Sequence, residues 1–143
     1  MLVIFGASGD LTARKLVPAL YNLYKSKHLP ENFVVLGVSR SNLTDGEFRR
    51  KVVLESTYLA ERIKNDSQEV IDTFANKFFY EDLGVDYSHG YDLLATRISD
   101  LNAKYRTDGN YIFYFSTPPS LYEIIAGNLA QQQLNVEDNG WKR

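Results

Sequence analysis

Four short apolar runs alternate with segments of helical periodicity along this chain, and this alternation limits the folds that it can adopt. The runs cover residues 2–5, 33–38, 77–83 and 111–115. Each has the length and the apolar content of a buried strand. Strands that alternate with helices pair in parallel through right-handed crossovers. We therefore predict an α/β fold with an open, doubly wound parallel sheet in the strand order 3-2-1-4.

The segments between the runs carry helix signals. Leucines three and four residues apart predict a first helix over residues 10–25, in which Pro18 should cause a kink or a restarted first turn. A capping-box spacing from Thr44 to Glu47 predicts the start of a helix over residues 45–64, and the same spacing recurs from Ser120 to Glu123. Further helices are predicted over residues 68–76 and around residues 91–101.

The composition fits one domain and excludes several classes of protein. The chain has 143 residues, 44% of them hydrophobic, and a formal net charge of −2. Without a clustered basic excess, we predict no nucleic-acid partner. Without cysteine, disulfides and thiolate metal sites are excluded, and we predict no metal. No apolar run approaches the roughly 18 residues of a membrane span, and no signal peptide is recognisable, so we predict a cytoplasmic protein with no membrane partner.

The glycine turn after the first strand is the strongest functional motif. It runs Gly6, Ala7, Ser8, Gly9, Asp10 and Leu11, directly before the first helix. A helix N-terminus offers free N–H groups and a partial positive charge, and glycines let the backbone approach a pyrophosphate closely. The turn therefore predicts a dinucleotide site, although a plain strand-to-helix turn would use the same glycines. We expect the Asp10 carboxylate to serve the helix N-terminus and to point away from the ligand.

The second motif lies at the end of the second strand, where Arg40 stands between Ser39 and Ser41. Domains that bind NAD usually carry an acid at this place, which accepts a hydrogen bond from the ribose 2′-hydroxyl. A guanidinium instead grips a phosphate through two parallel hydrogen bonds. The position predicts NADP as the cofactor. The alternative is an ordinary solvated surface arginine.

These motifs occur within longer stretches that resemble the glucose-6-phosphate dehydrogenases. The stretches are residues 6–23 (GASGDLTARKLVPALYNL), 29–30 (LP), 37–40 (GVSR), 114–123 (YFSTPPSLYE) and 140–141 (GW). The resemblance covers the whole chain and implies that residues 1–143 form a Rossmann-type NADP-binding domain. It also implies that the chain is truncated, so that the last strand or strands are missing and the edge at residues 111–115 is exposed.

The resemblance implies an activity and further site residues. Members of the family oxidise glucose 6-phosphate to a 6-phosphogluconolactone and reduce NADP, in the pentose phosphate pathway. Carried over, residues 6–11 hold the pyrophosphate, Arg40 holds the 2′-phosphate and Lys15 orients the site. Gly84 and Val85 line the adenine, and the loop at residues 118–119 approaches the nicotinamide.

The family's catalytic residues have no counterpart here. The Glu-Lys-Pro and Asp-His-Tyr-Leu-Gly-Lys motifs of the family would lie beyond Arg143, and neither His28 nor His89 matches the catalytic histidine. We therefore expect no catalytic residue and no activity from this chain alone. Glucose 6-phosphate would bind only with the missing catalytic domain, in a full-length enzyme that the resemblance implies is a homo-oligomer. A self-standing NADP-binding redox sensor and a non-binding fragment remain as alternatives.

Overall fold

The computed structural model describes residues 1–84, 87–137 and 140–143, and it contains a four-stranded parallel sheet. The strands are β1 (Leu2–Phe5), β2 (Val35–Ser39), β3 (Phe78–Asp82) and β4 (Ile112–Phe115). Their order is β3-β2-β1-β4, which confirms the predicted order. In the register, Phe5 at the end of β1 is opposite Val38 on one side and Phe115 on the other. The loops that follow these strands therefore meet at one edge of the sheet.

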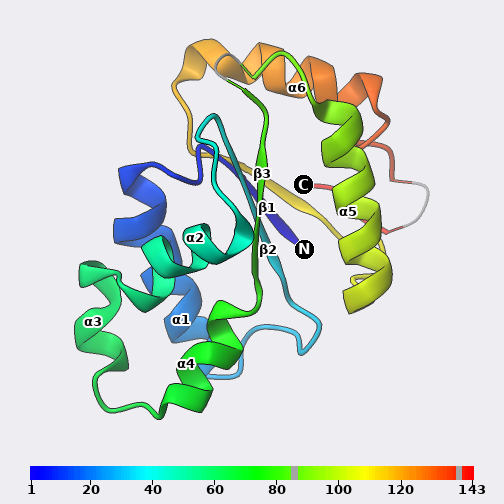
Figure 1. Cartoon of the computed structure of the whole chain (residues 1–143). Helices are drawn as coiled ribbons and strands as arrows, with labels where there is room; N and C mark the ends of the chain where they lie inside the picture. Colours follow the sequence, from blue (N-terminus) through cyan, green and yellow to red (C-terminus); the bar gives the residue numbers. More distant parts are fainter. Residues whose placement is uncertain (85–86, 138–139) are drawn as a thin grey trace.

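Helical segments cover both faces of the sheet. They are the π-helical turns η1 (Thr12–Leu16) and η2 (Arg50–Leu54), the 3₁₀ turn η3 (Pro119–Leu121), and the α-helices α1 (Val17–Lys25), α2 (Asp45–Arg49), α3 (Thr57–Ile63), α4 (Gln68–Ala75), α5 (Tyr91–Tyr105) and α6 (Tyr122–Gln131). Helices α1 to α4 lie on one side of the sheet, and α5 and α6 lie on the other (Figure 1). The predicted doubly wound arrangement is confirmed.

Each face of the sheet has its own apolar core, because side chains alternate along a strand. Ile4, Val35 and Phe78 point toward α1 to α4, and Phe48 and Phe74 pack on them. The other core lies between the sheet and the helices α5 and α6. Its fully or almost fully buried members include Val3, Phe5, Leu36, Val38, Leu94, Ile98 and Ile125.

The first helix starts twice, as the position of Pro18 predicts. The N–H of Val17 donates to the carbonyl of Thr12, five residues earlier, which closes the π-helical turn η1. Helix α1 then begins at Val17 with Pro18 in its first turn, where the missing N–H of proline is least costly.

The predicted helix over residues 45–64 is wrong in its extent. Its start is confirmed, because Thr44 Oγ1 accepts from the N–H of Glu47 and Glu47 accepts from the N–H of Thr44. The chain then passes through η2 and breaks at Ser56, whose backbone is extended. This break turns α3 so that Leu59 is buried in the same core as α1, a long-range contact that no local motif encodes.

Two other expectations are also corrected. Ser120 does not cap a helix, because it lies inside the turn η3 that the two prolines begin, and α6 has no side-chain cap. The edge of β4 is partly covered. The N–H of Tyr111 donates to Trp141, and the N–H of Phe113 donates to Arg143, at 2.9 and 2.7 Å. Residues 141–143 thus pair in parallel beside Tyr111 through an isolated bridge, and within the described chain the N–H of Phe115 is left on the open edge.

Candidate functional site

A cavity of about 190 Å³ lies at the edge of the sheet where the strands end. It is lined by residues that follow all four strands: Gly6, Ser8, Gly9, Ser39, Arg40, Tyr87, Ser116, Thr117, Pro118 and Leu121. Ligands of open α/β sheets bind in such a crevice beyond the carboxyl ends of the strands. Gly6, Ser8 and Gly9 of the predicted glycine turn therefore line the same cavity as Arg40, whereas Ala7, Asp10 and Leu11 do not line it.

Part of the glycine turn anchors the loop to the sheet. The N–H groups of Gly6 and Ala7 both donate to the carbonyl of Val38, at 2.8 and 3.1 Å. Gly6 has a φ of +81°, and a Cβ there would lie 2.3 Å from the Ser116 carbonyl oxygen. Ala7 is completely buried, so its side chain belongs to the core. These residues shape the loop without exposing hydrogen-bond donors.

The other part of the turn presents free donors. Within the described chain, the N–H groups of Ser8, Asp10 and Leu11 have no hydrogen-bond partner. They stand where the helical backbone begins, and the positive end of the helix dipole adds to them. The Asp10 carboxylate is exposed and pairs with Arg14 at 3.0 Å, one turn along the helix. That pairing partly neutralises the one acidic side chain of the loop.

The residues around Arg40 are held by hydroxyl groups. Ser8 Oγ lies 2.8 Å from Ser39 Oγ and 3.1 Å from Ser41 Oγ. The hydroxyl of Tyr80 donates to the carbonyl of Ser41 at 2.7 Å, and burial raises the pKa of this tyrosine. Arg40 itself is exposed, and its guanidinium has no partner among the described residues. A hydrogen-bonded loop thus presents an exposed arginine whose guanidinium could bind an anion.

Of the remaining predicted residues, Lys15 and Gly84 do not line this cavity, whereas Pro118 of the predicted nicotinamide loop does. Lys15 is an exposed residue of η1, and it does not line the cavity. Gly84 is exposed with a φ of +72°, and its N–H donates to Asp82. Val85 lies outside the described residues. Tyr87 was missed: it is buried and donates to Ser39 Oγ at 3.3 Å. The one sequence signal that could have identified Tyr87 as a site residue was its position shortly after the third strand.

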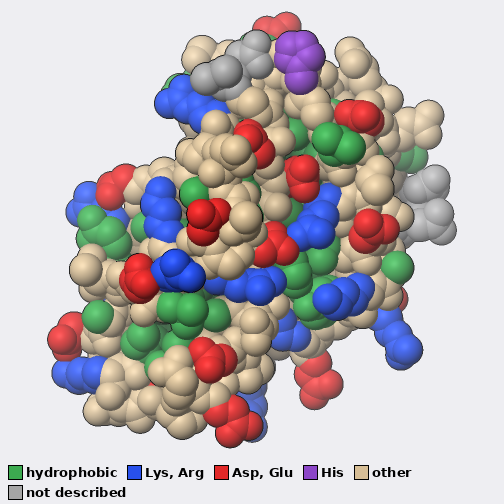
Figure 2. All heavy atoms as spheres, viewed as in Figure 1, with side chains coloured by type: hydrophobic (Ala, Val, Ile, Leu, Met, Phe, Trp, Pro, Cys, Tyr) green, Lys and Arg blue, Asp and Glu red, His purple; other side chains and the backbone are tan. Residues whose placement is uncertain are grey.

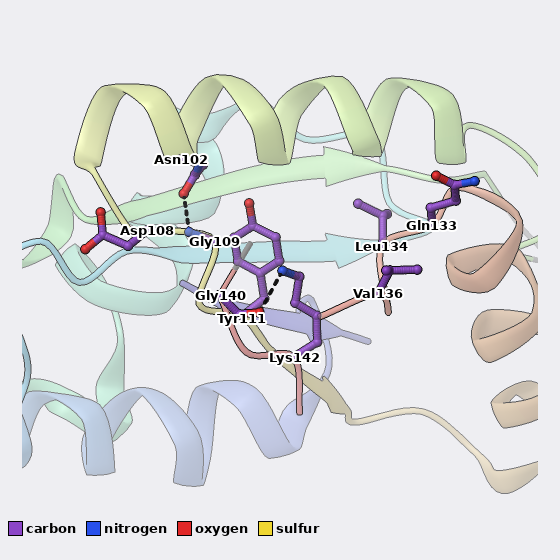
Figure 3. Close-up of a pocket in the computed structure, with 9 residues that line it drawn as sticks. All are labelled: Asn102, Asp108, Gly109, Tyr111, Gln133, Leu134, Val136, Gly140 and Lys142. Carbon is purple, nitrogen blue, oxygen red and sulfur yellow. Dashed lines mark hydrogen bonds between the residues drawn. The ribbon is translucent and has the colours of Figure 1, made fainter. Parts of the chain in front are cut away.

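The described residues form a further cavity, but they contain neither a metal site nor a membrane-spanning helix. A cavity of about 520 Å³ lies between α5 and the C-terminal segment, near Tyr111 at the opposite end of β4 (Figure 3). Among the described residues that line it, Asp108 and Lys142 are the charged ones. Among the described residues, no cluster of His, Asp and Glu side chains could hold a metal ion. In the same part of the chain, no helix is long and apolar enough to cross a membrane.

Comparison with known proteins decides the family. The family model described as glucose-6-phosphate dehydrogenase, NAD binding domain, matches residues 3–143. The chain belongs to this family. The resemblance inferred from the sequence is confirmed, and the four-stranded sheet is the part of the family's fold that these residues form.

Individual relatives agree with the family assignment. A glucose-6-phosphate 1-dehydrogenase of Aggregatibacter actinomycetemcomitans is 47% identical, with 99% of this chain covered, and one of Treponema pallidum is 40% identical over the whole chain. A solved glucose-6-phosphate dehydrogenase in complex with its substrate glucose-6-phosphate superposes with a TM-score of 0.80, at 28% identity. It also covers 99% of this chain. In all three comparisons, the chain spans 28% of the relative's length.

Proposed function

We propose that residues 1–143 form the NADP-binding domain of an enzyme that oxidises glucose 6-phosphate to 6-phosphogluconolactone. Family membership supports the reaction class, and the names of the relatives support the substrate. The observation that carries the choice of NADP is Arg40, a guanidinium without a partner among the described residues at the end of β2. When bound, the nicotinamide of NADP supplies the acceptor for the hydride.

The residues present fit such a cofactor. The free N–H groups of Ser8, Asp10 and Leu11 suit a pyrophosphate, for which Gly6, Ala7 and Gly9 shape the loop. Arg40 suits the 2′-phosphate. A cavity of about 190 Å³ is smaller than the 300–1,000 Å³ of typical ligand pockets, so the ends of the cofactor would extend beyond it. Those ends are where we place Lys15, Gly84 and Val85, and the loop at residues 118–119, whose Pro118 lines the cavity, would approach the nicotinamide.

The chemistry itself needs residues that are not found among the described residues lining this cavity. A hydride leaves a sugar hydroxyl only if a general base takes the proton. Among the residues that the structure describes, no histidine, aspartate or glutamate lines the cavity, and His28 instead contacts Ser26 at 2.7 Å. We propose that these residues contribute cofactor binding, while the base and the sugar-phosphate site belong to other residues of the enzyme.

The wider setting follows from the same proposal. We place the enzyme in the cytoplasm and in the pentose phosphate pathway, as a homo-oligomer without nucleic-acid or membrane partners. On the face shown in Figure 2, basic and acidic side chains are interspersed, which does not favour a polyanion.

Titration of NADP and NAD against the complete gene product tests the proposal. Arg40→Ala should weaken NADP by about 10- to 100-fold, because a bidentate charge-assisted contact is lost. NAD lacks the 2′-phosphate and should bind as before, and Arg40→Asp should reverse the preference. An equal loss of both cofactors in Arg40→Ala would contradict the role given to Arg40. Failure of the unaltered protein to bind NADP would contradict the proposed function.

A further inference from the structure

A lysine distant in sequence from both motifs reaches the glycine loop. Lys51, in the π-helical turn η2, donates from Nζ to the carbonyl oxygen of Ser8 at 3.0 Å. This residue of the loop also carries the hydroxyl that contacts Ser39 and Ser41, the two neighbours of Arg40. Lys51 is therefore linked through Ser8 to the two serines that flank Arg40.

The neighbouring basic residues have different partners. Arg49 lies 4.0 Å from Asp45, and Arg50 lies 3.7 Å from Glu55. Lys51 pairs with no carboxylate among the described residues, and the partner of its ammonium is the neutral carbonyl of Ser8. An ammonium has three N–H donors, so two of them remain available on this exposed side chain. Lys51 is the member of this basic run whose charge is left uncompensated beside the loop.

The charge of the 2′-phosphate explains why a second cation near Arg40 would favour binding. A phosphate monoester has a second pKa near 6 and carries about −1.5 to −2 charges at pH 7. Arg40 alone supplies one positive charge. A second cation beside Ser8 would complete the neutralisation, with the lysine acting as a point charge next to the planar fork of the arginine.

We propose that Lys51 binds the 2′-phosphate of NADP together with Arg40 and thereby contributes to the preference for NADP over NAD. The inference rests on the proposed function, because it assigns a further residue to the same site. The competing explanation is that Lys51 holds the loop in place through Ser8 and affects every ligand of the loop equally.

Calorimetric titration with two fragments of the cofactor separates these explanations. Adenosine 2′,5′-bisphosphate carries the 2′-phosphate, and AMP is the matched ligand without it. In the complete gene product, Lys51→Ala should weaken the bisphosphate by about 3- to 10-fold and leave AMP within about 2-fold. Lys51→Arg should retain most of the affinity. Arg50→Ala removes the same charge from the adjacent residue, and it should leave both affinities within about 2-fold.

Each other outcome overturns the inference. An equal loss for both ligands in Lys51→Ala would mean that the lysine positions the loop. Unchanged affinities in Lys51→Ala, together with a selective loss in Arg40→Ala, would remove Lys51 from the site and leave the proposed function intact. A wild-type protein that binds the bisphosphate no better than AMP would overturn both. Thermal denaturation of each variant verifies that it is folded.

Discussion

Gly6 lies directly against the backbone of Ser116, so that a Cβ on Gly6 would stand 2.3 Å from the Ser116 carbonyl oxygen. The two residues are 110 positions apart in the chain, and they follow the adjacent parallel strands β1 and β4. Their contact closes one side of the candidate cofactor site. The close approach of the Ser116 backbone and the positive φ thus require a glycine here for the fold itself.

We predict that Gly6→Ala destabilises the protein by at least about 2 kcal/mol, because it combines a positive φ with a steric overlap. Gly127→Ala in α6 is the matched control, since a Cβ there meets no atom within 4 Å. It should stabilise by about 0.5–1 kcal/mol, because alanine is the better helix former. Urea denaturation measures both. Equal stability of wild type and Gly6→Ala would show that the loop adjusts freely.

The second glycine should affect ligands more than the fold. In Gly9→Val, the Cβ would lie 3.0 Å from the Gly6 carbonyl, a tight contact, and the added methyl groups would stand beside the free N–H groups of the loop. We expect NADP and NAD to weaken together, by about 10-fold or more, because both contain the pyrophosphate. Fluorescence titration with each cofactor tests this. A loss confined to NADP would place the 2′-phosphate, not the pyrophosphate, at Gly9.

A carboxylate outside the site should make stability depend on pH. Asp66 accepts hydrogen bonds from Lys25 and Tyr21, and these bonds lower its pKa below the ordinary value of 3.8. Because the folded-state pKa is lowered, this stabilisation is present above pH 3.8 and is lost as the pH falls through the folded-state value. Asp66→Asn should therefore have a lower Tm at pH 7, and the difference should shrink below about pH 4.

Thermal melts of both proteins between pH 2.5 and 7 measure this convergence. Asp100→Asn is the control for the lost charge, since Asp100 is exposed on α5 and forms no ion pair among the described residues. A difference between wild type and Asp66→Asn that stays constant down to pH 2.5 would contradict the assignment.

An apolar patch beside β4 should promote association of the polypeptide of residues 1–143. Leu23, Ile112 and Trp141 are each about two-fifths exposed and line one cavity of about 450 Å³. Light scattering should detect oligomers as the concentration rises, and Ile112→Ser should reduce them, because exposed apolar patches favour contacts between molecules. Leu93→Ser, at an exposed site on α5, should have no such effect. A strictly monomeric wild-type polypeptide would contradict this prediction.

Several features were predictable because they depend on local sequence. The apolar runs identified all four strands, and the alternation with helices gave the strand order, since right-handed crossovers leave few topologies. Pro18 marked the restart of the first helix for a chemical reason, its missing N–H. The glycine turn and Arg40 lie close together because the loops after parallel strands meet at one edge of the sheet, and their role as cofactor-binding residues stays a prediction.

The sequence by itself determined the strands, their order, the family and the two motifs of the candidate site. The tertiary structure decided which backbone N–H groups of the turn stay free, because Val38 on a neighbouring strand takes those of Gly6 and Ala7. It also decided that Tyr87 donates to Ser39 and that Lys51 donates to Ser8. The pairing of residues 141–143 with the edge of β4 was decided in the same way. These outcomes depend on contacts between residues far apart in the chain. A local sequence pattern cannot predict them, because it does not show which distant residues will be neighbours in the fold.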